Sequence, residues 1–471
     1  MISHQAPEQS VRLQSFSVSA TALALALVAC GGAVTNTAQS DGGSTGDDSG
    51  GVAIDSGANT LQDSGSTVHD AAREAAPIDT GIDTGGPSSV YPAFPIDAPQ
   101  VQDNGGPTLA APVIVTITWS TDPDANTYNT FGDTIGASSY WHALNTEYSV
   151  GPATSGTTNH VTITTAPAAT MADSDLDTLV ATNAGVAPWP ASTPNTIYAV
   201  YMPPGMGLTF GGQDVCQQGI GGYHSETSGN VVYAIMPHCN GFMTQDVELS
   251  ASHELDEAVT DPHTNSNPAY IYFDQNHLAM EFFNSFQSEI GDACEMMMAN
   301  ADPIDFPPYV VQRQWSNKAA AAGHDWCVPS ADGYMYNTTL LPSSNEDAIS
   351  VDLSSLGLGV GVVPSKGFKV ALNQTRTFPI GLFSDKALSG PFTIDVQGLG
   401  QPIGQDQQGN PINNGTATVT LDRTSGVNGE IANVTVTPTA YSSVGVVFFY
   451  IRSVLPGSQQ HHYLPILISQ N

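Results

Sequence analysis

Basic side chains, Lys and Arg, are scarce in this chain. Only ten of its 471 residues are Lys or Arg, against 44 Asp and Glu, so the formal net charge is −34. Proteins that bind nucleic acid neutralise phosphates with Lys and Arg, so this balance excludes a nucleic-acid partner. No Lys or Arg lies between Arg73 and Arg313. An acidic cluster inside that stretch therefore has no basic side chain from the same stretch to neutralise it.

Long apolar runs are also scarce. Beyond the N-terminal region, no run approaches the ~20 residues that a transmembrane helix needs. The early run at residues 16–29 follows Arg12 and ends in Leu27-Val28-Ala29-Cys30, which resembles a lipoprotein signal. We therefore expect export, with Cys30 acylated and the chain lipid-anchored to the outer membrane or cell surface. The alternative is an ordinary secretory signal in which Cys30 is incidental.

The chain has no CxxC pair, so a cysteine-based zinc site is a weak interpretation of its remaining cysteines. These are Cys216, Cys239, Cys294 and Cys327. Export makes disulfides the expected state. Four cysteines allow three connectivities, and the sequence alone does not choose among them. Their order along the chain suggests Cys216–Cys239 and Cys294–Cys327.

Composition divides the chain into four segments. Residues 1–30 form the predicted signal peptide. Residues 31–87 are rich in Gly, Ser, Asp and Thr, with repeated Asp-Ser-Gly and Asp-Thr-Gly triplets. Such a segment buries too little apolar surface to offset chain entropy, so we expect a disordered acidic linker. Residues 88–332 mix helical and strand patterns, whereas residues 333–471 show short alternating strands.

The predicted fold class is α+β, with a mixed α/β domain followed by a small all-β domain. In the first domain we expect strands at residues 113–119, 160–165, 195–202, 231–236, 269–273 and 309–315, and helices at 137–148, 174–183 and 246–261. In the second we expect strands at 375–383, 392–396, 417–421, 431–438, 444–451 and 463–468. Their spacing is typical of an immunoglobulin-like sandwich, which we expect to act as a spacer or adhesion module.

The predicted helix at residues 246–261 carries the central pattern of the chain. Its apolar residues recur at helical spacing, at positions 247, 251, 255, 258 and 259. Pro262 ends the helix because it lacks a backbone donor. His253 and Glu257 are four residues apart, so they lie one turn apart on the same face. The frame is that of the zinc-peptidase helix HExxH, with Glu257 in the second histidine position.

Further acids extend this cluster: Asp261 follows the helix, and Glu289 and Asp292 lie near Cys294. Unpaired carboxylates in a partly buried site cost several kcal/mol each, unless they are protonated, exposed or bound to a divalent cation. The candidate metal ligands are therefore His253, Glu257, Asp261, Glu289 and Asp292. The imidazole favours Zn2+, whereas a set made only of carboxylates would favour Ca2+ or another hard metal such as Mn2+.

Two other side chains have candidate roles in catalysis. Glu254 stands where the peptidase motif has its general base, so it would take a proton from a metal-activated water. His224, in a predicted hairpin before the helix, is a possible accessory ligand or transition-state donor. The edge of that hairpin could receive an extended peptide. His263 matches a third-ligand position of the longer HExxHxxGxxH pattern, but Thr260 replaces its glycine, so we rank it below the acids.

Several segments together resemble a known family. They are Ser252-His253-Glu254-Leu255, Thr260-Asp261-Pro262, Glu289-Ile290-Gly291-Asp292 with Cys294, Gly222-Tyr223-His224, Tyr233-Ala234-Ile235-Met236-Pro237 and Trp315-Ser316-Asn317. In this order, over about residues 100–330, they resemble bacterial secreted relatives of the plant EXORDIUM (phosphate-induced) family. The resemblance implies a zincin-like extracellular domain with an HExxE variant of the motif. Plant members are associated with cell-wall growth signalling, which implies an extracellular role without turnover.

These observations predict an exported, lipid-anchored, zinc-dependent peptidase-like hydrolase that acts on extracellular protein or peptide. We expect a monomer that touches the membrane only through its lipid. Two alternatives stay open. One is a non-catalytic cell-surface binding protein whose acidic site holds structural calcium. The other is an exposed acidic surface braced by disulfides, without a bound ion.

Overall fold

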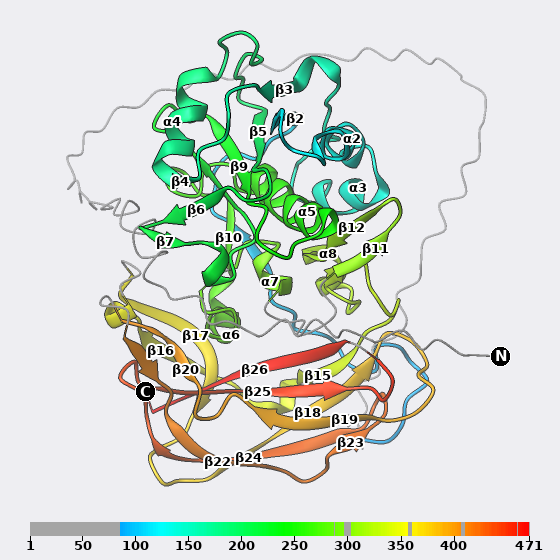
Figure 1. The fold of residues 1–471 in the computed structure, drawn as a ribbon. Helices are drawn as coiled ribbons and strands as arrows, with labels where there is room; N and C mark the ends of the chain where they lie inside the picture. Colours follow the sequence, from blue (N-terminus) through cyan, green and yellow to red (C-terminus); the bar gives the residue numbers. More distant parts are fainter. Residues whose placement is uncertain are drawn as a thin grey trace, which may run out of the picture. The chain divides into compact units, whose positions relative to one another are not determined.

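A five-stranded sheet forms the centre of the first half of the chain in the computed structural model (Figure 1). The structure describes residues 85–286, 288–295, 303–356, 360–406, 410–458 and 460–470. The predicted acylation site Cys30 and the predicted linker up to residue 84 lie outside them. The sheet order is β3-β2-β5-β9-β8, where the strands are β2 (Val113–Trp119), β3 (His160–Ile163), β5 (Thr196–Tyr201), β8 (Tyr223–Glu226) and β9 (Val232–Met236).

Four of these strands run parallel, and β8 pairs antiparallel with β9 at one edge. Strands β2, β5 and β9 are buried on both faces, as their nearly continuous apolar and β-branched sequences predict. The predicted hairpin before the central helix is thus confirmed.

Helices cover both faces of the sheet. One face packs against α2 (Ala125–Ile135), α3 (Ser139–Asn145) and α5 (Thr244–Thr260), and the opposite face packs against α4 (Asp173–Asn183). Along β5 the alternation is visible residue by residue, because Ile197 and Ala199 join the first layer and Tyr198 and Val200 the second. This period of two is what a central strand requires.

Short elements complete this half. The strands are β1 (Val101–Asp103) paired with β10 (Tyr270–Phe273), β4 (Thr170–Ala172) with β6 (Gly207–Phe210) and β7 (Gln213–Asp214), β11 (Pro303–Phe306) with β12 (Tyr309–Gln312), and β13 (Gln314–Trp315) with β14 (Cys327–Val328). The helices are α6 (Leu278–Phe283), α7 (Asp292–Glu295) and α8 (Asn317–Ala321).

The structure differs from the sequence predictions for this half in three places. Helix α2 was not predicted, although Tyr128, Phe131 and Ile135 show helical spacing, because Asn, Thr, Gly and Asp between them are weak helix formers. The strand expected at 309–315 is two strands, interrupted at Arg313, whose buried guanidinium bonds to carbonyl oxygens and to Asp325. The helix expected at 137–148 is shorter, from Ser139 to Asn145.

The second half consists of strands in two main sheets (Figure 1). A four-stranded sheet has the order β15-β18-β24-β22, and a six-stranded sheet has the order β16-β17-β26-β25-β19-β23. The bounds are β15 (Tyr336–Leu340), β16 (Asp347–Asp352), β17 (Val362–Lys369), β18 (Arg376–Ser384), β19 (Phe392–Gln397), β22 (Thr416–Leu421), β23 (Ser425–Gly426), β24 (Ile431–Ala440), β25 (Val446–Val454) and β26 (His461–Ser469). Strands β20 (Pro402–Gln405) and β21 (Pro411–Asn413) form a separate pair.

Residues from both sheets, among them Phe368, Phe378, Val434 and Phe449, share one apolar cluster. All six strands predicted for this half are confirmed within a few residues, whereas β15, β16, β17, β20, β21 and β23 were not predicted. The described residues from 85 onward belong to one compact unit. Among the described helices, none has the length and apolar character needed to cross a bilayer. The expected mixture of helices and strands is confirmed, in a fold rich in sheets.

Candidate metal centre

Helix α5 positions three of the predicted site residues. Its apolar stripe, which consists of Val247, Ala251, Leu255, Ala258 and Val259, is at most 1% exposed. At its start the backbone N–H of Met243 donates to the Asp246 carboxylate at 2.7 Å. The helix ends at Thr260, two residues before Pro262, as predicted. His253, Glu254 and Glu257 lie on the remaining surface and are nevertheless buried.

His253 and Glu257 face each other across one helical turn. The distance from His253 Nε2 to Glu257 Oε2 is 3.0 Å, and Asp292 Oδ1 lies 3.7 Å from the same nitrogen. The other oxygen of Glu257, Oε1, accepts the backbone N–H groups of Gly291 and Asp292, both at 3.0 Å. These two bonds fix the carboxylate, so Oε2 stays directed at the imidazole. Helix α5 and the segment 288–295 therefore meet at Glu257.

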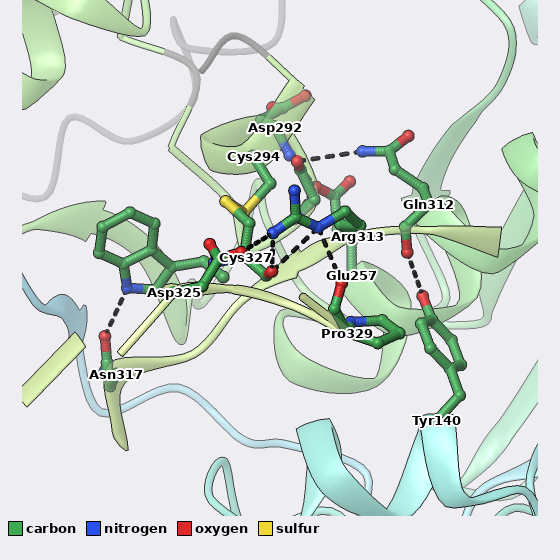
Figure 2. Close-up of a disulfide and its surroundings, with 12 residues drawn as sticks. Tyr140, Glu257, Asp292, Cys294, Gln312, Arg313, Asn317, Asp325, Cys327 and Pro329 are labelled. Atoms are coloured by element: carbon green, nitrogen blue, oxygen red, sulfur yellow. Dashed lines mark hydrogen bonds and ion pairs between the residues drawn. A yellow bond between two sulfur atoms is a disulfide. The ribbon is translucent and has the colours of Figure 1, made fainter. Parts of the chain in front are cut away.

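The segment 288–295, hereafter the acidic segment, is held from three sides. Trp315 N–H donates to the carbonyl of Ile290 at 2.7 Å, and Gln312 Nε2 donates to the carbonyl of Gly291 at 3.1 Å. The disulfide Cys294–Cys327 closes its far end. Figure 2 shows Asp292 and Glu257 in the surroundings of this disulfide, together with the bond from Gln312.

Gly291 is a glycine for a steric reason. A Cβ at this position would lie 2.6 Å from Glu257 Oε1 and 2.8 Å from the imidazole of His253. Gly222, at the entry to β8, has the same relation to Glu254, since its Cβ would lie 2.7 Å from Glu254 Cγ. Both glycines belong to the sequence segments that flank the predicted site, and both let backbone pass close over an acidic side chain.

His224, on β8, stands among three carboxylates. Its Nδ1 lies 3.5 Å from Glu254 Oε2 and 3.7 Å from Glu257 Oε2, and its Nε2 lies 3.4 Å from Glu289 Oε1. Nε2 is also 3.2 Å from the carbonyl oxygen of Asp261, to which it can donate. When Nε2–H donates to that carbonyl, Nδ1 faces the acids of α5. In the protonated ring Nδ1 is a second donor, and in the neutral ring it is an acceptor. The predicted accessory residue is thus part of the cluster.

The predicted residues are not equally placed. Ligand atoms within 4.8 Å of one another form three groups: His224, Glu254 and Glu257; His253, Asp292 and Glu295; and Glu257, Glu289 and Asp292. Asp261 belongs to none of these groups. Its Oδ1 accepts the N–H of Ala269 at 2.6 Å, and its Oδ2 is buried without a hydrogen-bond partner. Asp261 therefore supports the turn after α5 and contributes its carbonyl to His224.

Two residues behave differently from their sequence interpretation. His263, ranked as a weak ligand, bonds to Glu226 on β8, and Glu226 also accepts the N–H of Ser266 at 3.0 Å. The contact between His263 and Glu226 thus connects the loop after α5 to the hairpin of β8 and β9. Glu295 was not predicted, although it lies three residues after Asp292, which places both acids on one face of the short helix α7.

Burial shapes the electrostatics of the acids. It raises the pKa of Glu289 to about 8 and that of Asp261 to about 6. Burial, and then repulsion from Glu257, also raises the pKa of Asp292 well above its usual range. Glu257 is the exception: burial acts to raise its pKa, but His253 and the other groups around it lower the pKa below its ordinary value. Glu257 is therefore the anion at the centre of the cluster.

The imidazoles respond to the same charges. Burial disfavours their charged forms, yet Glu289 and Glu254 around His224, and Glu257 and Glu254 around His253, raise the pKa of both rings well above 6.5. Arg313, the first basic residue after Arg73, is paired with Asp325 (Figure 2). Within the described residues, Glu254, Glu257, Glu289 and Asp292 form their ion pairs with His224 and His253.

Both predicted disulfides are present. Cys216 pairs with Cys239 and Cys294 pairs with Cys327, with Cα–Cα distances of 5.5 and 5.7 Å. The second one anchors the acidic segment to β14. The suggestion from their order along the sequence is therefore confirmed, and the cysteines are not zinc ligands in this fold.

Comparisons with known proteins give low-scoring likenesses to solved structures. No protein-family model matches it, and no curated protein matches it. Among solved structures, the ASH / PapD-like domain of human CEP192 (PapD-like domain 7) is similar at 15% identity, over 28% of this chain and 87% of that chain, with a TM-score of 0.16. Domains 4 and 5 of the S-layer protein SbsC are similar at 13% identity, over 35% of this chain and 87% of that chain, with a TM-score of 0.13. Scores this low carry no argument about fold or function.

Proposed function

We propose that His253, Glu257 and Asp292 hold a zinc ion and that the protein is a zinc-dependent hydrolase of extracellular peptide or protein. The observation that carries the proposal is the convergence of Glu257 and Asp292 on His253 Nε2, at 3.0 and 3.7 Å. Ligands of a tetrahedral zinc ion lie about 2.0–2.2 Å from the metal and so roughly 3.3 Å from one another. The two distances to His253 Nε2 bracket that separation, and Asp292 shares one of the three close groups of ligand atoms with His253 and another with Glu257.

Charge supports the same proposal. Glu254, Glu257 and Asp261 are at most 5% exposed, so exposure does not relieve their repulsion. A divalent cation would replace the protons that the cluster otherwise retains at neutral pH. Glu289 Oε1 is buried without a hydrogen-bond partner, and it faces this same cluster through His224. Glu289 therefore belongs to the acidic cluster that a cation would neutralise, although it is not one of the three proposed ligands.

Glu254 is the proposed general base. When bound, zinc lowers the pKa of a coordinated water and polarises a carbonyl. Glu254 lies beside His253 in sequence and faces Gly222 and His224, so its carboxylate borders the same space without being one of the three proposed ligands. Its pKa is raised by burial and lowered by His253, with a net rise. A carboxylate with a raised pKa is better suited to accept and return a proton near neutral pH.

His224 has the role of a donor in this proposal. Its ring reaches Glu254 from β8, the antiparallel edge strand of the central sheet. An extended peptide added along such an edge would pass next to both side chains. The imidazole could then donate a hydrogen bond to the oxygen on which charge develops.

The remaining features follow as parts of the proposal. We assign the first half a zincin-like fold, supported by a helix with the HExxE frame packed on a mixed sheet, and the second half an immunoglobulin-like sandwich, supported by its two sheets. The segments that carry the EXORDIUM resemblance contain most residues of the proposed site, among them His253, Glu254 and Asp292. Export, acylation of Cys30, anchoring to the outer membrane or cell surface and a monomeric state complete the proposal. The two disulfides support an oxidising compartment.

A second function is a non-catalytic binding protein with structural calcium. One observation favours it: Glu257, Glu289 and Asp292 form a group made only of carboxylates. Calcium prefers six to eight oxygen ligands, and such a group supplies several of them. In that case Glu254 would have no proton to transfer, and substitution of Glu254 would leave the function unchanged.

Casein cleavage by the purified full chain separates the two functions. Glu254→Gln keeps the shape of the side chain but removes the base, so we expect turnover to fall by a factor of roughly 100 or more. Glu248→Gln is the matched control, because Glu248 is equally buried on α5 but lies beside the backbone of Val310. Equal cleavage by the wild type and Glu254→Gln would contradict the catalytic role. Calcium in place of zinc in the purified chain would favour the second function.

A further inference from the structure

Helix α6 joins the acidic segment to the sheets of the second half. Leu278 and Phe282 of α6, and Phe286 just after it, are buried in one apolar cluster with side chains of those sheets and their loops, which include Ile349, Val351, Ile403, Ile412, Val446, Phe448 and Leu467. The ring of Phe282 stacks on that of Phe448 with an interplanar angle of 28° and centroids 6.1 Å apart, and Phe283 meets Tyr450 edge-on at 5.0 Å. The helix has only six residues, so this packing is what fixes its position.

The chain turns sharply after α6. Ser285 and Phe286 both have left-handed backbone conformations, with φ of 55° and 62°. Each costs roughly 1–2 kcal/mol for a residue other than glycine. The N–H of Phe286 donates to the carbonyl of Glu281 at 2.8 Å, and the buried ring of Phe286 contributes about 2 kcal/mol of apolar burial. The strained turn therefore depends on the cluster that receives Phe286.

Glu281 links this turn to the acidic segment. Its Oε2 accepts the hydroxyl of Ser288 at 2.9 Å, and its Oε1 accepts the N–H of Phe273 at 2.5 Å. Glu281 is 4% exposed and Ser288 is 1% exposed, so water does not compete for these bonds. Ser288 immediately precedes Glu289. The bond therefore sets where the acidic segment begins.

We propose that Glu281, Phe286 and Ser288 are positioning residues of the metal centre, and that the C-terminal sheets act through them to hold Glu289 and Asp292 in place. This inference rests on the proposed zinc centre. It gives the second half a role other than the expected spacer. The other anchors of the acidic segment come from Trp315, Gln312, Glu257 and the disulfide at Cys294, and they all act after Glu289. The hydrogen bond between Glu281 and Ser288 lies before Glu289 in sequence, so Glu289 is held by contacts on both sides.

The test is the zinc dissociation constant of the full chain, measured by competition with a chromophoric chelator. Glu281→Ala removes both acceptors, and Ser288→Ala removes the hydroxyl donor. Each should weaken zinc binding by roughly tenfold, the low end of what loss of a group bonded directly to a ligand costs, because the start of the segment that carries Asp292 is released. Glu281→Gln is the matched rescue variant, because its amide oxygen can accept from Phe273 and its amide nitrogen can donate to the hydroxyl of Ser288. It should bind zinc as the wild type does.

A second pair of variants separates positioning from general stability. Phe286→Leu trims the aromatic anchor of the turn, and Phe392→Leu trims a fully buried ring between the two sheets, in a cluster that α6 does not join. Both should lower the urea midpoint of unfolding, but only Phe286→Leu should weaken zinc binding. Each zinc dissociation constant is measured under conditions in which the unfolding curve shows the variant to be folded.

The outcomes are distinguishable. Wild-type affinity in Ser288→Ala, Glu281→Ala and Phe286→Leu would overturn the positioning roles while the zinc centre stands. Equal weakening by Glu281→Gln and Glu281→Ala, or by Phe392→Leu and Phe286→Leu, would also overturn them. A wild-type chain that binds no zinc would overturn the zinc centre and this inference together.

Discussion

Glu257 and Gly291 lie 34 residues apart in sequence, yet the carboxylate of the first accepts the backbone N–H of the second at 3.0 Å. The contact is so close that a methyl group at position 291 would lie 2.6 Å from Glu257 Oε1. It joins the helix that carries the histidine-acid motif to the segment that carries Glu289 and Asp292. The site is therefore built from two distant parts of the chain, and this contact is where they meet.

Substitution of Gly291 should damage the site directly. In Gly291→Ala the new methyl group would displace Glu257 or His253, at a cost of about 1–3 kcal/mol for overpacking. We expect a lower urea midpoint and weaker zinc binding. Gly390→Ala is the control, because a Cβ there meets no atom within 4 Å. Unchanged zinc affinity in Gly291→Ala would mean that the contact does not organise the ligands.

The two disulfides should differ in their effect on the site. Loss of either, as Cys294→Ser with Cys327→Ser or as Cys216→Ser with Cys239→Ser, should lower the free energy of unfolding by about 2–4 kcal/mol. Only the first pair should also weaken zinc binding, because it anchors the acidic segment. His253, Glu257 and Asp292 all lie outside the loop that Cys216–Cys239 closes. Equal zinc constants for the two double variants would contradict this division.

Stability should depend on pH through Glu281. Burial raises the pKa of this carboxyl to about 7, whereas an unfolded glutamate has a pKa of about 4.3. A raised pKa means that its contribution is fully present below the unfolded value and is lost as pH rises through 7. Glu281→Gln should therefore match the wild type near pH 4 and exceed its stability by about 3 kcal/mol at pH 8. Urea midpoints that stay parallel across this range would refute the shift.

The sequence was sufficient to predict those parts of the site that lie within a single helix or hairpin. A period of 3.6 residues places His253 and Glu257 on one face whatever surrounds them, and Pro262 marks the end of the helix. The four cysteines pair in the order in which they occur along the chain, and the hairpin of β8 and β9 is local. The helix and the hairpin agree with the structure because each depends on short-range geometry, and both disulfides agree with the order of the cysteines.

The remaining parts depend on contacts between distant segments, which periodicity does not report. Asp261 follows the helix as predicted, but its carboxylate bonds to Ala269 and leaves the ligand groups. Glu295 joins His253 and Asp292 only because the disulfide and Glu257 fold the acidic segment back over α5. The role of α6 was equally hidden, since its apolar partners come from strands far along the chain.

Metal content is the most direct test of the central claim. The full chain, purified without added metal and dialysed against metal-free buffer, is analysed for zinc, calcium and manganese beside the variant Glu257→Gln. We expect about one equivalent of zinc in the wild type, as a single site requires, and little in the variant, because an amide replaces the Glu257 oxygen that faces His253. A wild-type chain that stays free of zinc after incubation with one equivalent would contradict the account.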